Sequence, residues 1–222
     1  MSVVITGTSS GIGRAIATKF LNCGYHVVGI DKEPSTISGP SYSHFIYEIK
    51  GTEEDYSFLP YVRNCEILIN NAGVQNSGKD IDVNLRGLMN CTRVYGLQPN
   101  IKAIVNVGSA SAHHSAEFGE YVASKGGVLA YSRWTAKEIA KWGATCNCIS
   151  PGGVITDLNA CVLDNKNLWN RIMDMTPLEK WATAEEIADW VYFLAVINKS
   201  CTGQAILIDN GEFYNHKFVW EG

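Results

Sequence analysis

Two groups of residues in this chain have the types and the spacing to do chemistry together. Tyr121 and Lys125 lie four residues apart, which on a helix puts a phenol and an ammonium on one face, about 5–6 Å apart at Cβ. Far earlier in the chain, a glycine-rich stretch runs from Thr6 to Gly13. A phenol beside a positive charge can donate or accept a proton, and a glycine-rich turn can hold phosphate groups. Together they predict proton transfer beside a bound dinucleotide, as the interconversion of an alcohol and a ketone requires.

The glycine-rich stretch has the surroundings that a dinucleotide site needs. Residues 2–5 are typical of a buried strand, and a helical pattern begins at Gly11. Here Gly7 permits the tight turn, Gly11 lets the backbone approach the pyrophosphate, and Gly13 allows close helix–strand packing. The other residues predicted to contact the phosphates are Ser9, Ser10 and Ile12. A plain strand–helix turn is the alternative for a glycine pattern alone, but this context favours a pyrophosphate site.

An acidic residue ends the next predicted strand. Residues 25–30 form that strand and Asp31 follows it, about 20 residues past the glycines. A carboxylate here accepts hydrogen bonds from the adenosine ribose and repels a 2′-phosphate. Neither the turn nor Ser10 supplies a cation to offset that repulsion, so we predict NAD rather than NADP. Lys32 could soften the preference, but we expect a solvated loop lysine.

The elements that must position these residues alternate along the whole chain, which predicts repeated βαβ units. The expected strands are residues 2–6, 25–30, 44–49, 65–69, 101–107, 144–149 and 204–208. The expected helices are 11–23, 52–63, 80–97, 120–142 and 183–197, with a weaker stretch at 158–174. Thr183 and Glu186 form a capping box, and residues 34–43 read as a surface loop. We predict one domain over residues 1–222, α/β in class, with a doubly wound, Rossmann-type parallel sheet of about seven strands and helices on both faces.

The composition excludes several classes of protein. The net charge of −4 offers no basic stripe for nucleic acid. No apolar run approaches the roughly 20 residues that span a bilayer, and the start lacks a signal-peptide pattern, so we expect a cytoplasmic protein without membrane or nucleic-acid partners. Seven cysteines are scattered, and the one close pair, Cys146 and Cys148, has no second pair to complete a metal site. We therefore predict reduced thiols and no metal.

With these residues in view, the chain resembles the short-chain dehydrogenase/reductase family, in its small single-domain branch, essentially from end to end. Besides the glycine turn, the likeness rests on Asn70-Asn71-Ala72-Gly73, Val83-Asn84, Ile104 to Ser109, Tyr121 with Lys125, Pro151 to Thr156, Pro177-Leu178 and Thr202-Gly203-Gln204. A tyrosine and a lysine at this spacing are common by chance, whereas this series in order is not. The resemblance implies an oxidoreductase that uses a nicotinamide cofactor and acts on a small-molecule alcohol or carbonyl.

The resemblance implies a catalytic set of four residues. Tyr121 would donate the proton when a ketone is reduced and accept it when an alcohol is oxidised. The ordinary pKa of a tyrosine phenol, near 10, is too high for a base at neutral pH. Lys125 would favour the phenolate by its positive charge and would also bind the nicotinamide ribose. Ser109 would hold the substrate oxygen against Tyr121, and Asn84 would anchor a water that links Lys125 to solvent. Each residue alone has a structural alternative, so the prediction rests on all four together.

The resemblance also implies further cofactor contacts from three segments. The segment after the fourth strand would pass the adenosine ribose, and the one after the third strand would lie against the adenine. The loop after the sixth strand would meet the nicotinamide carboxamide or the pyrophosphate. In that order, the residues are Asn71, Ala72 and Gly73, then Glu48 and Ile49, then Pro151, Gly152, Val154 and Thr156.

The predicted substrate region is the least defined part of the chain. Residues at about 157–176 would form a lid, with simple packing on the domain as the alternative. We expect the loop at 111–115 to border the pocket. His113 and His114 could contact the substrate there, but we favour ordinary loop histidines. The tail at 212–222 is too aromatic to fray, and we expect it to pack on its own surface or on a neighbouring subunit. Family members are commonly oligomers through helices near 80–97 and 120–142, which implies a homodimer or homotetramer.

Three functions remain open at this point. The favoured one is a dehydrogenase or reductase that transfers a hydride between NAD(H) and a small alcohol or carbonyl compound. An NADPH-dependent carbonyl reductase is the second, distinguished by whether Asp31 tolerates a 2′-phosphate. A non-catalytic, nucleotide-sensing protein of the same fold is the third, and such chains typically lose the tyrosine or the lysine. The sequence does not indicate the substrate.

Overall fold

The computed structural model describes residues 2–51, 62, 64–115 and 118–214, and within them seven parallel strands form the central sheet. The strands follow the order β3-β2-β1-β4-β5-β6-β9. Their bounds are β1 Ser2–Thr6, β2 His26–Asp31, β3 Tyr42–Ile46, β4 Cys65–Asn70, β5 Ala103–Val107, β6 Thr145–Pro151 and β9 Ala205–Ile208. The order reverses at β1, which pairs with β2 on one side and β4 on the other. Such a reversal opens a crevice for a ligand at the carboxyl ends of the strands.

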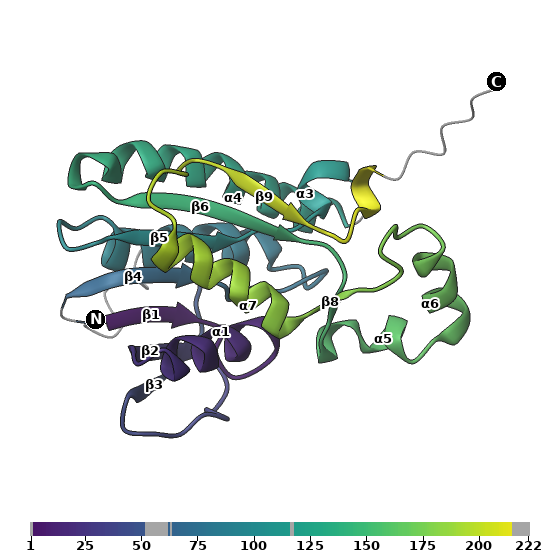
Figure 1. Ribbon diagram of the computed structural model, residues 1–222, viewed down its shortest axis with the longest axis horizontal. Coiled ribbons are helices and arrows are strands. Elements are labelled where there is room, and N and C mark those ends of the chain that lie inside the picture. The colour runs from purple at the N-terminus through teal and green to yellow at the C-terminus, as the bar shows by residue number, and fades with distance from the viewer. Residues whose placement is uncertain (1, 52–61, 63, 116–117, 215–222) are drawn as a thin grey trace.

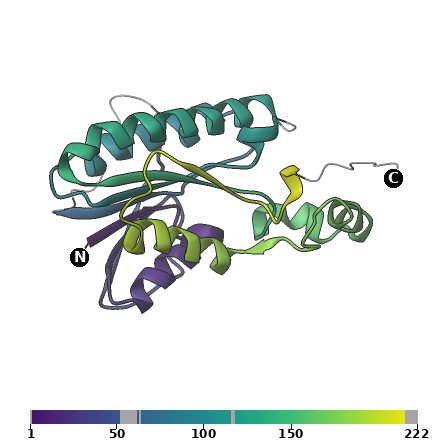
Figure 2. The same ribbon diagram turned by 45° about the horizontal axis from the view of Figure 1, so that its top comes forward.

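Helices cover both faces of the sheet. Figure 2 shows α4 and the segment before β5 on one face, and α1 with α7 on the other. Their bounds are α1 Gly11–Asn22, α4 Gly119–Ile139 and α7 Ala184–Tyr192, and the segment before β5 consists of η2 Ile81–Gly87, α2 Leu88–Cys91 and η3 Thr92–Gly96. Short turns extend two of the helices, η4 Ala140–Trp142 after α4 and η6 Phe193–Ile197 after α7. The layers are therefore helix, sheet and helix.

The apolar strands supply two cores, one on each face. Val3 and Ile5 of β1 belong to the core beneath α1 and α7, which also contains Phe20. Val4, which lies between them in sequence, belongs to the opposite core with Ile139 of α4. Successive side chains of a strand point to opposite faces, so a strand that is apolar at every position is buried on both sides, as parallel sheets require.

The smaller elements gather beyond the carboxyl ends of the strands. In Figure 1 the arrowheads of the strands point toward α5 and α6. The elements are α3 Ser111–His114, β7 Val154–Ile155, η5 Asp157–Asn159, α5 Ala160–Leu163, α6 Lys166–Met173, β8 Ala182–Thr183 and η7 Glu212–Tyr214. β7 and β8 pair in parallel and form a separate two-stranded sheet. These elements surround the edge where a ligand is expected.

The predicted fold class is confirmed, and the main difference lies at the edge of the sheet. β3 spans Tyr42–Ile46, whereas the sequence pattern predicted a strand at 44–49, so the strand begins inside the predicted loop at 34–43. Among the described strands, β3 pairs with β2 alone. This pairing, rather than an apolar run of its own, sets where β3 starts. The predicted helix at 52–63 lies almost entirely outside the described residues.

The helix predictions agree with the structure where a cap or a long pattern marks them. The capping box is confirmed, because the Thr183 hydroxyl accepts from the Glu186 amide at 3.2 Å and the Glu186 carboxylate accepts from the Thr183 amide at 2.9 Å. The weaker stretch at 158–174 is divided into three short helices, η5, α5 and α6. In the described part of the chain, the helices are too short or too polar to cross a bilayer.

Candidate functional site

A cavity of about 640 Å³ opens where the strand order reverses, at the carboxyl ends of β1, β2, β4, β5 and β6. All the predicted site residues line it except Ser9 and Asn84. Its size is within the range of cavities that hold small ligands and cofactors. We call the wall formed by residues 7–13, 31–33 and 71–73 the turn region. The lid region is residues 157–159 with α5 and α6.

The glycine-rich turn between β1 and α1 has no room for a side chain at Gly7 or at Gly13. Gly7 has a φ of +75°, and a Cβ on it would lie 2.9 Å from the Ala72 Cα. A Cβ on Gly13 would lie 1.8 Å from the Gly7 carbonyl oxygen. Ser10, the N-cap of α1, is exposed and makes no side-chain capping hydrogen bond. The start of α1 therefore presents unpaired amides and the positive end of the helix dipole to the cavity, which fits a pyrophosphate.

The end of β4 is tied to the same turn. The Thr6 hydroxyl accepts from the amides of Asn71 and Ala72, both at 3.0 Å. The Asn71 side chain donates to the carbonyl oxygens of Thr6 at 2.9 Å and Gly7 at 3.2 Å. These bonds hold the two strand ends on either side of the reversal at a fixed separation. The predicted cofactor contacts of Asn71, Ala72 and Gly73 thus lie on a rigid wall.

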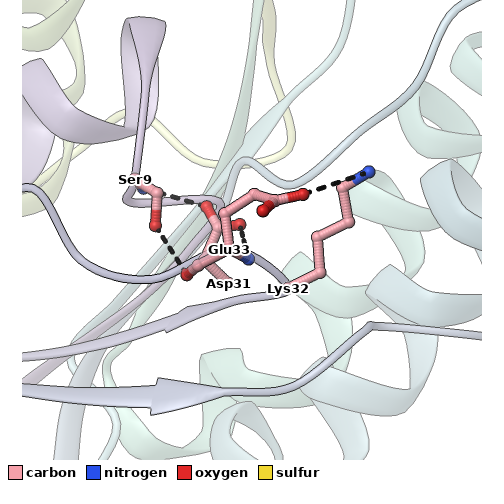
Figure 3. A network of polar contacts seen from close by, with 4 residues as sticks. All are labelled: Ser9, Asp31, Lys32 and Glu33. Atoms are coloured by element: carbon pink, nitrogen blue, oxygen red, sulfur yellow. Dashed lines mark hydrogen bonds and ion pairs between the residues drawn. The ribbon is translucent and has the colours of Figure 1, made fainter.

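Asp31 lines the cavity, and backbone amides hold its carboxylate, as the polar contacts in Figure 3 show. Its Oδ2 accepts from the Ser9 amide at 2.9 Å and its Oδ1 from the Glu33 amide at 3.0 Å. The Ser9 hydroxyl donates to the Glu33 carbonyl oxygen at 3.0 Å. Ser9 therefore differs from its prediction as a phosphate ligand, because its amide and its hydroxyl both bind the segment that follows β2.

Tyr121 and Lys125 meet at the cavity wall as their helical spacing predicts. The Lys125 ammonium lies 5.8 Å from the centroid of the Tyr121 ring and donates to the Val107 carbonyl oxygen, at the end of β5, at 3.0 Å. Only 5% of Lys125 is exposed. This burial lowers the pKa of Lys125 to about 8, while Cys148 and Asp80 oppose the shift. A buried ammonium with a lowered pKa beside a phenol is typical of a catalytic site.

The segment after β5 carries Ser109 and two histidines. The Ser109 hydroxyl, which lines the cavity, accepts from the Ser111 amide at 3.2 Å. His114 also lines the cavity, and its ring stacks on Phe213 at 6.4 Å. His113 instead hydrogen-bonds to the Ser150 hydroxyl at 3.0 Å, and burial lowers its pKa. The start of the predicted tail thus packs on this segment, and residues 215–222 lie outside the described chain.

Asn84 is placed behind the cavity wall rather than on it. Its Oδ1 accepts from the Val74 amide at 2.7 Å, and its Nδ2 donates to the Val74 carbonyl at 2.9 Å and to the Ser124 hydroxyl at 3.0 Å. It lies on η2, a π-helical turn, and such turns are frequent at functional sites. A Cβ on Gly73 would lie 3.1 Å from the Asn84 Oδ1 and 3.4 Å from the Lys125 Nζ. Asn84 and Lys125 therefore approach one another across a glycine.

The lid region is connected to the cavity wall through Trp181. The Trp181 ring lies against Gly153, where a Cβ would be 2.0 Å from the indole. It also meets the ring of Trp169 on α6 edge to face, at 5.3 Å between centroids. Gly153 lines the cavity. One buried indole therefore contacts both the helix of the lid and the loop after β6.

Several lining residues were missed by the sequence analysis. The segment from Val74 to Lys79 contributes four of them, and Glu33 and Glu212 contribute carboxylates. Glu212 had one available signal, because the aromatic residues beside it predicted a packed segment. The residues at 74–79 form no helix or strand and carried no recognisable pattern.

The cysteines do not form a site in the described part of the chain. Cys146 and Cys148 are buried thiols on β6. Burial raises the pKa of Cys148 to about 11, although Lys125 opposes the shift. Among the described residues, no three His, Cys, Asp or Glu side chains come together in a group that could hold a metal ion.

Comparisons with known proteins agree with this geometry. A family model described as Enoyl-(Acyl carrier protein) reductase matches residues 62–212. The chain is 29% identical to the 3-oxoacyl-[acyl-carrier-protein] reductase FabG of Staphylococcus epidermidis, over 96% of this chain and 98% of that protein.

Two solved structures are similar throughout. The first, 4-hydroxyisoleucine dehydrogenase complexed with NADH, has a TM-score of 0.84 and 26% identity, over 97% of this chain and 99% of that one. The second, from Beutenbergia cavernae, is described as an NAD(P)-dependent gluconate 5-dehydrogenase with bound NADP; its TM-score is 0.86 and its identity 25%, over 96% of each chain.

The matches and the site agree on the kind of chemistry. Relatives of this fold carry a nicotinamide cofactor, and the glycine turn here fits a dinucleotide. The Tyr121–Lys125 pair lines the same cavity. The chain belongs to the short-chain dehydrogenase/reductase family and is an oxidoreductase that acts on CH–OH groups with a nicotinamide cofactor.

Proposed function

We propose that this enzyme transfers a hydride between NAD(H) and a small alcohol or carbonyl compound, with Tyr121 as the proton donor and acceptor. The observation that carries the proposal is that Tyr121, Lys125 and Ser109 line the same cavity as the glycine-rich turn. The bound nicotinamide supplies the hydride in reduction and accepts it in oxidation. The residues of the chain bind, orient and move the proton.

Two hydroxyls hold the substrate oxygen in this proposal. In the direction of ketone reduction, the Tyr121 phenol gives its proton to that oxygen, and in oxidation the phenolate takes it back. The Lys125 ammonium stabilises the phenolate by charge. The Ser109 oxygen accepts from the Ser111 amide, but its own hydrogen stays available for the substrate oxygen.

Asn84 and Lys125 support the path that returns the proton. Both hydrogens of the Asn84 amide are used, whereas its Oδ1 accepts one bond in the described structure and has a second lone pair. The Lys125 ammonium has three hydrogens and gives one to the Val107 carbonyl. Because Gly73 puts no side chain between them, a water can join the two groups and carry a proton to solvent.

The position of Asp31 supports NAD as the cofactor. Each carboxylate oxygen accepts one backbone amide and retains capacity for a ribose hydroxyl. A 2′-phosphate in the same place would meet a fixed negative charge. NADP is the second candidate, because Lys32 lines the cavity and a similar structure contains NADP.

A nicotinamide absorbance assay tests the proposal. NAD(H) and NADP(H) are each tried with a panel of alcohols and ketones. We expect turnover with NAD(H), and we expect Tyr121→Phe to lose about 10²–10⁴-fold in kcat/KM, the usual size of a general-acid contribution. Tyr131→Phe on the same helix is the matched control. Retained turnover in Tyr121→Phe would remove Tyr121 from its role, and no turnover with any pair would favour a non-catalytic nucleotide sensor.

Assembly is a separate part of the proposal. Val94 and Trp134 are exposed on η3 and α4, and Tyr131 stacks on Trp134 at 5.2 Å. An apolar face of this kind supports a homodimer or homotetramer formed through these helices. Light scattering after gel filtration measures the mass directly, and Trp134→Glu should lower it to that of one chain.

A further inference from the structure

The segment from Asp31 to Glu33 is fixed more firmly than its exposed position would suggest. Its two ends are joined, since the Asp31 carboxylate accepts the Glu33 amide at 3.0 Å. Ser9 binds it with its amide and its hydroxyl, as Figure 3 shows. The Ser9 carbonyl also accepts from the Thr36 hydroxyl, further along the same loop, at 2.9 Å. All three polar groups of Ser9 therefore hold this loop against the glycine-rich turn.

A second set of bonds reaches the same segment from the edge of the sheet. The His44 Nε2 lies 2.9 Å from the Glu33 carbonyl oxygen, and the His44 Nδ1 lies 2.9 Å from the Tyr42 hydroxyl. The Tyr42 hydroxyl lies 2.9 Å from that of the buried Thr8. The Glu33 carbonyl oxygen is thus within hydrogen-bond distance of both the Ser9 hydroxyl and the His44 ring.

The hydrogens in this chain of bonds can be assigned from the Glu33 end. A carbonyl oxygen only accepts, so the His44 Nε2 carries a hydrogen and donates it. In a neutral imidazole the Nδ1 is then an acceptor, so the Tyr42 hydroxyl donates to it. The Tyr42 oxygen is left to accept from Thr8. Each of these donors has one acceptor, so the series of hydrogen bonds runs in one direction, with Thr8 donating to Tyr42, Tyr42 to His44 and His44 to Glu33.

The sequence makes room for this chain with a glycine inside a strand. A Cβ on Gly29 of β2 would lie 2.2 Å from the Tyr42 hydroxyl oxygen and 2.5 Å from the Thr8 hydroxyl oxygen. Glycine inside a strand often marks the close approach of another group. Here the approaching groups are the two hydroxyls, so the glycine lets the chain of bonds cross β2.

The charges of the fixed segment bear on the cofactor. Asp31, Lys32 and Glu33 all line the cavity. The Lys32 ammonium lies 3.9 Å from the Glu33 carboxylate, and both side chains are more than half exposed. Lys32 is the cation that could accept a 2′-phosphate beside Asp31. Glu33 attracts that cation and adds a second negative charge.

We propose that Glu33 is a second determinant of the preference for NAD(H), and that the hydrogen bonds from Thr8 through Tyr42 and His44 set its position. This inference rests on the proposed function, in which the ribose of the adenosine binds at Asp31. Glu33 acts on the ligand by charge. His44 and Tyr42 are positioning residues that act through the Glu33 carbonyl.

Two cofactor fragments test the role of Glu33 without turnover. Calorimetry gives the Kd of adenosine 5′-monophosphate and of adenosine 2′,5′-bisphosphate, and their ratio measures the penalty for the 2′-phosphate. Glu33→Gln should reduce this penalty by about two- to fivefold, the upper part of the range for exposed charges. The matched control, Glu185→Gln, removes an exposed carboxylate that does not line the cavity and should leave the ratio unchanged. In the double variant Lys32→Gln with Glu33→Gln, the penalty for the 2′-phosphate should return toward its wild-type value, because the cation that Glu33→Gln releases is then absent.

Variants of His44 test the positioning role. His44→Phe removes the donor to Glu33, and we expect the Kd of both fragments to rise and the penalty to fall, with kcat at saturating NADH unchanged. His44→Gln keeps a donor at the same reach and should restore both values. Tyr42→Phe removes the hydrogen bond that orients the His44 ring, and its Kd values should lie between those of His44→Phe and His44→Gln. If His44 only supported the fold, His44→Phe would lower kcat as well as weaken fragment binding, and His44→Gln would not restore the two Kd values.

The outcomes separate this inference from the proposed function. A wild-type protein that binds the bisphosphate more tightly than the monophosphate would contradict the NAD proposal and this inference with it. A wild-type preference for the monophosphate, with a ratio that Glu33→Gln leaves within twofold, would overturn the inference alone. Equal fragment affinities in His44→Phe and wild type would overturn the positioning role.

Discussion

In the turn region the cavity wall consists of strand ends that hydrogen-bond to one another, whereas in the lid region it consists of residues 157–159, which lead into the short helices α5 and α6. Ser9 of the turn region uses its amide and its hydroxyl to bind Asp31 and Glu33 of the same region, and its carbonyl accepts from Thr36 just beyond it. By contrast, α5 and α6 contain no buried residue, and Leu158 beside them is 67% exposed. Local stability follows burial and hydrogen bonding. The turn region, where we propose that the cofactor binds, is therefore held more firmly than the lid region, where we propose that the substrate binds.

The comparison predicts its largest effect at Gly13. In Gly13→Ala the Cβ would meet the Gly7 carbonyl, so α1 must move away from β1. We expect the free energy of unfolding to fall by about 3 kcal/mol or more, as for severe overpacking, with loss of NADH binding. Chemical denaturation and calorimetry measure the two effects.

Gly126→Ala on α4 is the matched control, because no atom lies within 4 Å of its Cβ. Alanine in a helix is favoured over glycine by about 0.5–1 kcal/mol, so this variant should be as stable as wild type or more so. Equal losses in the two variants would mean that the turn region is no more demanding than an open helix.

Lys125→Met should separate activity from stability. Burial lowers the pKa of Lys125 from 10.5 to about 8. At neutral pH the charged ammonium therefore has a higher free energy in the folded protein than in the unfolded chain, which destabilises the fold. Replacing it should raise the free energy of unfolding by on the order of 1–3 kcal/mol and abolish turnover.

The effect of Lys125→Met on stability should depend on pH in one direction. The unfolded chain binds more protons than the folded protein between about pH 8 and 10.5, so the stability of the wild type rises through that window. The gain from methionine should be complete below pH 8 and shrink above it. A gain that is constant from pH 7 to 10 would contradict the pKa shift.

The smallest effect is expected in the lid region. Leu158→Ala truncates a side chain that is 67% exposed and lines the cavity. We expect the free energy of unfolding to change by less than about 0.5 kcal/mol, as for surface substitutions, while KM for the substrate changes and the Kd for NADH does not. A change in the Kd for NADH with an unchanged substrate KM would place Leu158 against the cofactor.

The same contrast explains which parts of the site could be predicted from the sequence. The glycines at 7, 11 and 13 and the Tyr121–Lys125 pair could be located, because steric and helical constraints allow few residue types at fixed spacings. The strands β1, β2, β4 and β5 followed from apolar runs that both faces of a parallel sheet require.

What could not be predicted depends on contacts between distant segments. The role of Ser9 is set by Glu33, which lies 24 residues away, and no local pattern reports that contact. The start of β3 is set by its pairing with β2. Glu212 and the segment from Val74 reach the cavity through loops whose course is fixed by tertiary packing. The residues of the lid are amphipathic, but their pattern did not reveal three separate helices.

The position of Trp181 gives the enzyme a built-in optical probe. The indole is 7% exposed and contacts Gly153 of the cavity wall and Trp169 of the lid. Indole emission responds to the polarity of its surroundings, so a shift of α6 or of the loop at Gly153 would change it. Stopped-flow fluorescence of the unlabelled enzyme can therefore test whether the lid region moves when a substrate is added, with Trp181→Phe as the reference trace.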